Sequence, residues 1–345
     1  MAKENVTSED VARLANVSQS AVSRTFTPGA SVSERTRQRV LDAARELGYR
    51  PNALARAMIS GRSRLIAVLV AYLDNHFYPQ VLEILSRAVQ ERGYQVLLFL
   101  TERGTQDQMV QKMLQYQVEG IVMASADMSS SLARECADTG IPVVLFNRYV
   151  TSSLSSSVTS DNVGGARMVT ELLIAAGHQR IAYIAGTEDS STNQDRESGF
   201  LQAMERGGLL PFRRLVGDYT SEGAARAARK LFDNGELPDA IVVANDHMAF
   251  SVIDVIRDEA GLRVPEDISV VGFDDVPEAG WGGYKLTTVR QPADVMIEET
   301  VRILFDQIER GEVERRAVIV PATVSVRRSA RLPDPGSVAR IIEAG

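Results

Sequence analysis

The sequence predicts an α/β protein: a small all-α helix-turn-helix head, followed by two tandem doubly wound parallel α/β lobes. Two short helical patterns joined by a tight turn occupy residues 6–26. From Leu65 onward, continuously apolar runs alternate with amphipathic helical patterns, as in parallel sheets that helices cover on both faces. The chain has 345 residues, which suits two or three domains.

The first helix of the head begins after Thr7. Asp10 follows three residues later, and this spacing is typical of a capping box, in which the two side chains satisfy each other's backbone amides. Val11, Leu14 and Ala15 have the i, i+3, i+4 spacing of a buried stripe, so we expect all three to face inward. The turn falls at residues 16–17.

The second helix carries an unusual outer face. Ser18 can cap it and Val22 points inward, whereas Gln19, Ser20, Ser23 and Arg24 stay outside. A helix pair with a purely structural role has no reason to expose this set together. Small polar side chains with an arginine are what a recognition helix presents to base edges in the major groove, although Arg24 could instead form a surface ion pair.

A third helix is expected from Ser33 to about Leu47, with Gly48 at its C-terminal stop. A short helical segment, 51–61, then begins at Pro51 and ends at a glycine. About ten residues are too few for a helix that stands alone in water, so we expect this segment to become helical only when something orders it.

The apolar runs of the body are five to seven residues long, the length of buried strands. The helix predicted over residues 78–92 turns Val81, Leu82, Leu85 and Val89 inward. The runs are Leu65–Ala71, Gln95–Leu100, Gly120–Ala124, Pro142–Phe146, Arg180–Ala185, Ala240–Ala244 and Ile268–Phe273.

Charge is distributed unevenly along the chain. The net charge is −7, but residues 1–64 hold eleven Lys and Arg against six Asp and Glu. A basic head on an acidic body concentrates attraction to phosphates on the helix-turn-helix. No apolar run is long enough for a membrane span and no signal segment opens the chain, so we expect a cytoplasmic protein. The single cysteine, Cys136, excludes an internal disulfide.

Polar and aromatic side chains follow the predicted strands, where open α/β sheets bind ligands. Carboxylates and amides accept hydrogen bonds from hydroxyls, arginine donates a planar fork, and an aromatic ring packs on a sugar's C–H face. These residues predict a site for a polyol; Arg148 would also allow an acidic ligand. Asp246 and Asp274 could instead cap helices, and Arg196 could form a structural ion pair. The candidates are Tyr72, Phe77, Asn147, Arg148, Arg196, Tyr219, Asn245, Asp246, Asp274 and Gln291.

The stretches VTSEDVARLANVSQSAVSR and VSERTRQRVLDAARELGYRPNALAR resemble the LacI/GalR family of bacterial transcription repressors, and the resemblance runs over nearly the whole chain. The resemblance implies a body of the periplasmic-binding-protein-like type I fold and a short hinge helix that inserts an apolar side chain into the minor groove. The residues implied in DNA contact are Thr7, Ser18, Gln19, Ser20, Ser23 and Arg24 in the head, and Asn52, Ala55 and Met58 in the hinge.

The resemblance also implies a domain order. Residues 1–50 form the helix-turn-helix domain, 51–63 the hinge, 64–335 the effector-binding and dimerisation domain, and 336–345 a tail. Lobe one comprises 64–161 and 291–321, and lobe two 162–290 and 322–335. A strand at 318–320 should return to lobe one and a strand at 324–326 to lobe two. The tail has two prolines nearby and no leucine heptad, which favours a dimer.

We therefore expect a sequence-specific, DNA-binding transcription regulator, most simply a repressor, that is controlled by a sugar or sugar derivative bound between the lobes. Its partners would be pseudo-palindromic double-stranded operator DNA, the effector and a second copy of the chain. The effector could weaken DNA binding as an inducer or strengthen it as a corepressor. We expect no membrane partner.

We expect no cofactor, no metal site and no catalytic residues. The three histidines, His76, His178 and His247, have no metal-ligand spacing, and no GxSxG, P-loop or GxGxxG motif is present. The alternative from a different class is a cytoplasmic sugar-binding or sugar-metabolising protein without a regulatory role. Turnover of sugars would support an enzyme, and salt-dependent operator binding a regulator.

Overall fold

The computed structural model describes residues 6–27, 29–50, 62–71, 73–102, 104–124, 129–150, 154–233 and 235–344. The chain separates into two compact units, residues 1–64 and 65–345. The hinge segment 51–61, with the expected DNA contacts Asn52, Ala55 and Met58, and the candidate Tyr72 lie outside the described residues.

The head is built from three helices, which are α1 (Ser8–Ala15), α2 (Gln19–Thr25) and α3 (Glu34–Leu47). The predicted caps are present: Thr7 and Asp10 form a capping box, and the Ser18 and Ser33 side chains accept from the first turns of α2 and α3. The head core contains Val11, Val22 and Val40.

The prediction that Leu14 is buried was wrong, because its side chain is 45% exposed. Val11, Ala12 and Ala15 are the buried residues of α1. An α-helix turns by about 100° per residue, so these three share one face and Leu14 lies roughly 100° from its centre. The sequence of α1 allowed either the face with Leu14 or the face with Ala12 to be buried, and the helix packs against the other helices through the face with Ala12.

Replacing Thr7 with alanine is expected to lower the stability of the head by about 0.5–2 kcal/mol, because the change leaves an amide at the start of α1 without its acceptor. Thr7→Ser keeps the hydroxyl and should stay close to the parent protein. Amide hydrogen exchange of α1 reports the difference. Equal exchange in the alanine and serine variants would show that the cap contributes little.

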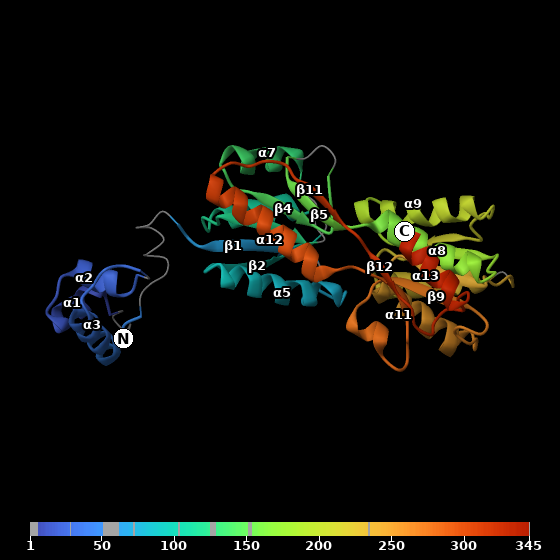
Figure 1. The fold of residues 1–345 in the computed structure, drawn as a ribbon, viewed down its shortest axis with the longest axis horizontal. Coiled ribbons are helices and arrows are strands. Elements are labelled where there is room, and N and C mark those ends of the chain that lie inside the picture. Colours follow the sequence, from blue (N-terminus) through green and yellow to red (C-terminus); the bar gives the residue numbers. More distant parts are fainter. Residues whose placement is uncertain are drawn as a thin grey trace. The chain divides into compact units, whose positions relative to one another are not determined.

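The first lobe contains a parallel sheet with the strand order β11-β5-β4-β3-β1-β2. Apolar residues fill both faces of this sheet, one core lying under α5 and α12 and another under α6 and α7 (Figure 1). Its elements are β1 (Leu65–Val70), α5 (Phe77–Glu91), β2 (Gln95–Leu100), α6 (Gln106–Leu114), β3 (Gly120–Ala124), α7 (Ser130–Asp138), β4 (Val143–Phe146), β5 (Ser156–Ser160), α12 (Ala293–Arg310) and β11 (Ala317–Val320).

The second lobe contains a sheet with the order β12-β10-β9-β8-β6-β7. Its core is one large apolar cluster. The elements are α8 (Asn162–Ala175), β6 (Ile181–Ala185), α9 (Ser191–Arg206), β7 (Arg214–Val216), α10 (Ser221–Phe232), β8 (Ala240–Val243), α11 (Asp246–Asp254), the π-helix Val255–Glu259, β9 (Ser269–Asp274), the 3₁₀-helix Pro277–Gly280, β10 (Thr287–Arg290) and β12 (Thr323–Ser325).

These two sheets confirm the predicted α/β class, with one difference. Strand β12 pairs with β10 in the antiparallel direction, so the second sheet is mixed rather than purely parallel. The reason is the entry point of the strand: the two residues after Val320 lead directly from the first lobe into β12, which begins opposite the end of β10, where Thr323 pairs with Arg290. A strand that begins beside the carboxyl end of its neighbour must run in the opposite direction.

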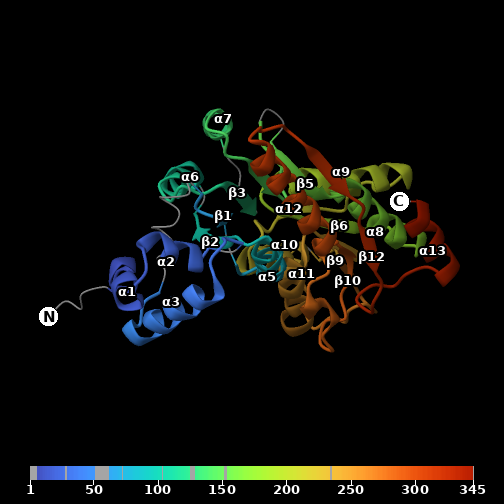
Figure 2. The same cartoon turned by 60° about the vertical axis from the view of Figure 1, so that its left-hand side comes forward.

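The chain passes between the two sheets three times, after β5, after β10 and after β11. In Figure 1 these links run side by side between the lobes. Helix α13 (Pro335–Ala344) follows and contacts α8 near the C-terminus, as Figure 2 also shows. Because β5, β10 and β11 end at this junction and β12 begins there, the strand ends of both lobes meet at it.

Candidate functional site

A small cavity lies where the strand ends of the two lobes meet. In this arrangement of the lobes it is nearly closed, with a volume of about 10 Å³, enough for about one water molecule. Its wall comes from the segments that follow β1, β4, β7 and β8, from the last residue of β9, and from α5 and α9. The lining residues are Asn75, Tyr78, Asn147, Arg148, Thr192, Arg196, Tyr219, Asn245 and Asp274.

The structure brings together six of the ten residues that the sequence nominated: Asn147, Arg148, Arg196, Tyr219, Asn245 and Asp274. Sequence reasoning missed Asn75, Tyr78 and Thr192. Asn75 belongs to the polar stretch after the first strand, so its position carried a signal. Tyr78 and Thr192 lie in the first turns of α5 and α9, where sequence alone does not say which side chain faces the junction.

Asp274 is the hub of the wall. Its Oδ2 accepts from Asn75 Nδ2 of the other lobe at 3.1 Å, and its Oδ1 accepts from Gln291 Nε2 at 2.7 Å. The Arg196 guanidinium lies 3.5 Å away. Burial raises the pKa of Asp274, and the charge of Arg196 opposes this rise. The backbone of Asp274 has a φ of 133°, a strained value of the kind that persists where surrounding contacts enforce it.

Arg196 is fixed by protein acceptors. Its Nε donates to Asn162 Oδ1 at 2.8 Å and its Nη1 to the Ala244 carbonyl at 2.6 Å. The guanidinium lies 3.8 Å from the centre of the Phe273 ring, a cation–π distance. Arg196 therefore forms the structural ion pair that the sequence left open, with Asp274, and its side chain also lines the cavity.

The residues after β4 join the lobes directly. Arg148 Nη1 donates to the Asn147 carbonyl at 2.9 Å and to Thr192 Oγ1 on α9. The Tyr149 hydroxyl donates to Asp195 at 2.9 Å, and burial together with Asp195 raises the pKa of this phenol to about 12. With the Asn75–Asp274 contact, these bonds link the lobes around the cavity. Any change in the angle between the lobes must alter them.

Tyr219 forms an aromatic part of the wall. Its ring lies against Gly186, where an added Cβ would come within 2.2 Å of the ring. Glycine is required at this position because any side chain would displace the ring. The Arg148 guanidinium lies 5.8 Å from the ring centre on the cavity side.

Three nominated residues do not line the cavity. Phe77 is buried in the first-lobe core, where its ring stacks at 6.3 Å on Phe146. Gln291 lies behind Asp274 and holds its carboxylate through Nε2. Asp246 accepts from the Thr288 hydroxyl and from the Val276 amide at 3.1 Å. Its carboxylate therefore ties α11 to β10 and to the segment after β9.

The cap expected of Asp246 belongs to its neighbour. Asn245 Oδ1 accepts from the Met248 amide at 3.0 Å and begins α11. Asp274 caps no helix either. Asp275 accepts from Arg327 at 2.6 Å and from the Ser325 hydroxyl at 2.7 Å. A polar residue that follows a strand can therefore form hydrogen bonds inside its own lobe instead of lining the cavity.

Stability is expected to fall as the pH rises from about 4 to about 8, because burial, with a smaller contribution from Asp274, raises the pKa of Asp246 to about 8. The unfolded chain releases this proton near its ordinary pKa of 3.8, whereas the folded chain keeps it up to about pH 8. The free energy of unfolding therefore decreases between these two pH values and is constant above them. Asp246→Asn should flatten this slope, since an amide can accept from Val276 and donate to Thr288. Urea unfolding between pH 5 and pH 8 tests this; equal slopes in the two proteins would contradict it.

No group of three or more His, Cys, Asp or Glu side chains within the described ranges is placed to hold a metal ion. His76 lies 3.0 Å from Glu278, His178 lies 3.4 Å from Asp239, and His247 lies 3.1 Å from the Ser221 hydroxyl. Burial of Cys136 raises the pKa of its thiol to about 11. The thiol therefore stays protonated near neutral pH, which fits a packing residue.

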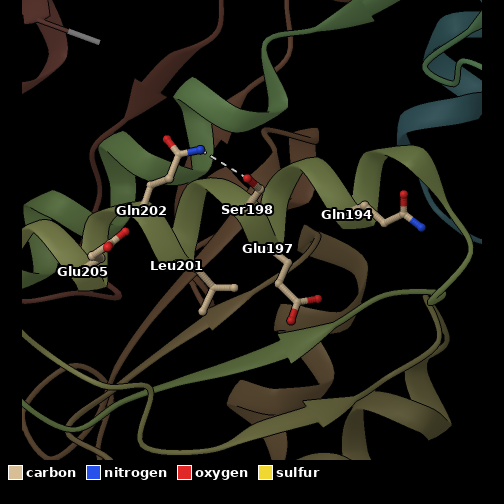
Figure 3. A pocket seen from close by; sticks show the side chains of 6 residues that line it. All are labelled: Gln194, Glu197, Ser198, Leu201, Gln202 and Glu205. Atoms are coloured by element: carbon tan, nitrogen blue, oxygen red, sulfur yellow. Dashed lines mark hydrogen bonds between the residues drawn. The ribbon is translucent and has the colours of Figure 1, made fainter. Parts of the chain in front are cut away.

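A second hollow runs along one face of α9, as Figure 3 shows. One of its lining side chains is apolar, Leu201, and it is 45% exposed. Glu197 is engaged by Arg214 at 2.5 Å. No other element contributes a side chain to this wall, so polar groups do not converge there as they do at the strand ends. Its lining is Gln194, Glu197, Ser198, Leu201, Gln202 and Glu205.

In the head, the residues nominated for DNA contact are exposed: Thr7, Ser18, Gln19, Ser20, Ser23 and Arg24. Two of them also have structural bonds, since Thr7 and Ser18 cap helices. Gln19 donates to Ser8 at 2.9 Å, which steadies its amide on the outer face of α2. Arg37 donates to the Thr25 carbonyl at 3.1 Å and Arg39 to the Asn16 carbonyl at 3.1 Å, so part of the head's positive charge braces its turns.

Comparison with known proteins divides the chain into the same two parts, the head and the body. Residues 7–52 match a model described as bacterial regulatory proteins, lacI family, and residues 170–330 match a periplasmic binding protein-like domain. The chain is 34% identical over 333 residues to the HTH-type transcriptional regulator CelR of Thermobifida fusca, covering 94% of this chain and 98% of CelR. It is 31% identical to the ribose operon repressor of Escherichia coli K12, covering 94% and 99%.

Solved structures agree with these relatives. The lac repressor dimer bound to operator and the anti-inducer ONPF has a TM-score of 0.85 and 28% identity, covering 94% of this chain and 99% of that one. The CelR–cellobiose complex has a TM-score of 0.71 and 31% identity, covering 94% and 100%. Among the described helices, none has the length and apolar character that crossing a membrane would require.

Proposed function

Because this chain belongs to the lacI family of bacterial regulatory proteins, we propose that α2 reads operator DNA and that the cavity between the lobes binds the controlling effector. The protein is a DNA-binding transcription regulator under small-molecule control, and it acts as a repressor with operator DNA, a sugar effector and a second copy of itself as partners. We further propose that the chain catalyses no reaction and that it works in the bacterial cytoplasm, where operator DNA lies.

Hydrogen bonds that cross from one lobe to the other around the cavity support effector binding at this place. Asn75–Asp274, Arg148–Thr192 and Tyr149–Asp195 join residues of different lobes, and the first two pairs line the cavity itself. A molecule bound there must break, replace or add to these contacts. Binding therefore favours one lobe angle over another, and this preference is the free energy that an effector can transmit to DNA affinity.

Exposed polar side chains on the head support the reading of operator DNA by α2. On α2, Gln19, Ser20, Ser23 and Arg24 are exposed while Val22 anchors the helix in the core. The second helix of a helix-turn-helix places its polar side chains on base edges, and the two heads of a dimer read two half-sites. For the hinge we propose DNA contact by Asn52, Ala55 and Met58 on the resemblance alone.

The direct test is binding of the purified protein to fragments of bacterial promoters, with and without a panel of sugars and sugar derivatives. We expect one dimer to bind a pseudo-palindromic site, with an affinity that falls steeply with salt and changes when one sugar is added. The same panel, followed for product formation, should show no turnover. Sugar binding without any DNA binding would overturn the regulatory proposal.

A further inference from the structure

One side chain on the outer face of α2 is tied to a different helix of the head. The Gln19 amide nitrogen, Nε2, donates to the Ser8 hydroxyl oxygen at 2.9 Å, and these two residues are the first of α2 and the first of α1. Gln19 is exposed, whereas Ser8 is half-buried. Because a hydrogen bond depends on direction as well as distance, Ser8 restricts the orientations that the end of the glutamine side chain can adopt.

The structural needs of the two helices are met by other residues. Thr7 is the cap of α1 and Ser18 is the cap of α2. Neither Ser8 nor Gln19 belongs to the apolar core of the head. The bond between them therefore acts on what the outer face of α2 presents, and it contributes little to how the helices begin or pack.

The bond also determines which groups of Gln19 remain for DNA. The amide nitrogen carries two hydrogens and Ser8 takes one, which leaves one N–H donor and the Oε1 acceptor on the same amide. In the major groove adenine presents the N7 acceptor beside the N6 donor, and a glutamine amide can bond to both at once. Guanine presents two neighbouring acceptors, N7 and O6, so Oε1 would face O6 with no hydrogen between them.

We propose that Ser8 is a positioning residue for base recognition: through its bond to Gln19, α1 orients the amide that α2 presents, and each head thereby selects adenine at one position of its half-site. The inference rests on the proposed function, because it concerns the same recognition helix. A free glutamine end can rotate and donate to guanine as well, whereas an end held by Ser8 must break this bond first. Fixing the side chain in advance also reduces the entropy that DNA binding would otherwise cost.

The test uses the full-length protein and a library of double-stranded DNA with randomised half-sites, from which the bound sequences are selected and counted. The parent protein should prefer adenine at one position of each half-site, and Gln19→Ala should abolish that preference. Ser8→Ala keeps the glutamine but frees its amide, so the preference for adenine over guanine at this position should fall at least about 5-fold. The other positions should keep their preferences.

Three further variants show that Ser8 acts through Gln19. Ser8→Thr keeps a hydroxyl and should keep the preference for adenine within about 2-fold of the parent. Gln19→Glu can accept from the Ser8 hydroxyl but offers DNA only acceptors, so the preferred base should change from adenine to cytosine, whose N4 is a donor. The double variant, Ser8→Ala with Gln19→Ala, should behave like Gln19→Ala alone.

Three results would overturn the inference. The first is an unchanged base preference in Ser8→Ala. The second is a loss of affinity for all sequences alike that persists when residue 19 is alanine, because Ser8 would then contact the DNA backbone itself. The third is a Gln19-dependent preference for a base other than adenine.

Arg24→Ala, measured with the same library, separates this inference from the proposed function. If Arg24→Ala changes the preference at its own base position while Ser8→Ala changes nothing, α2 still reads the operator and only the role of Ser8 is wrong. If no variant of Ser8, Gln19 or Arg24 changes any position, the proposed reading of DNA by α2 fails as well.

Discussion

Replacing Arg196 with methionine is expected to lower the free energy of unfolding of the body by about 3–5 kcal/mol. The change removes the cation that is paired with the buried Asp274 carboxylate, and it leaves the Asn162 side-chain oxygen and the Ala244 carbonyl without the donor that Arg196 supplies. Methionine keeps most of the length of the side chain, so the loss of charge and hydrogen bonds dominates over loss of volume. Urea unfolding of the full chain, followed by tryptophan fluorescence and circular dichroism, measures the change.

Arg229→Met is the matched control. Arg229 pairs with Glu259 at 2.6 Å, but both side chains are about half exposed, so losing this pair should change the free energy of unfolding far less than losing Arg196 does. If Arg196 served only as a ligand contact, its variant would unfold like the control and lose only the response to the effector. That result would contradict the structural half of its role.

Replacing Arg24 with alanine is expected to weaken specific operator binding by about 1–3 kcal/mol and to relax selectivity at one base position. The side chain is exposed on α2, and its removal should leave the head folded, because the head core does not include it. Fluorescence anisotropy with operator and with unrelated DNA, over a range of salt concentrations, separates lost base contact from lost phosphate contact.

Arg45→Ala is the control for this experiment. Arg45 is exposed on α3 and pairs with Asp42 at 3.1 Å, so it tests the loss of one positive charge away from α2. It should affect all DNA sequences alike and by less. An unchanged ratio of specific to nonspecific affinity in the Arg24 variant would show that another surface reads the bases.

Local signals in the sequence determined the elements and their order. Thr7, Ser18 and Ser33 predicted three helix starts because capping depends on a few neighbouring atoms. Continuously apolar runs predicted the buried strands of both sheets, since a strand covered on both faces has no polar side. The position of the cavity followed from one rule as well: ligands bind at the carboxyl ends of the strands in open α/β sheets.

Only the tertiary structure decided which side chains at those strand ends line the cavity. Asn245 and Asp246 are neighbours, yet the first lines the cavity while the second bonds to Thr288 and Val276 inside the lobe. Asn75 joins the site because its partner, Asp274, lies 199 residues away in the other lobe. Helix and strand periods are set by the backbone over a few residues, whereas the direction of a polar side chain is set by whichever distant donor or acceptor meets it on folding. The sequence by itself therefore determined where the site lies, and the packing of the two lobes decided which residues form it.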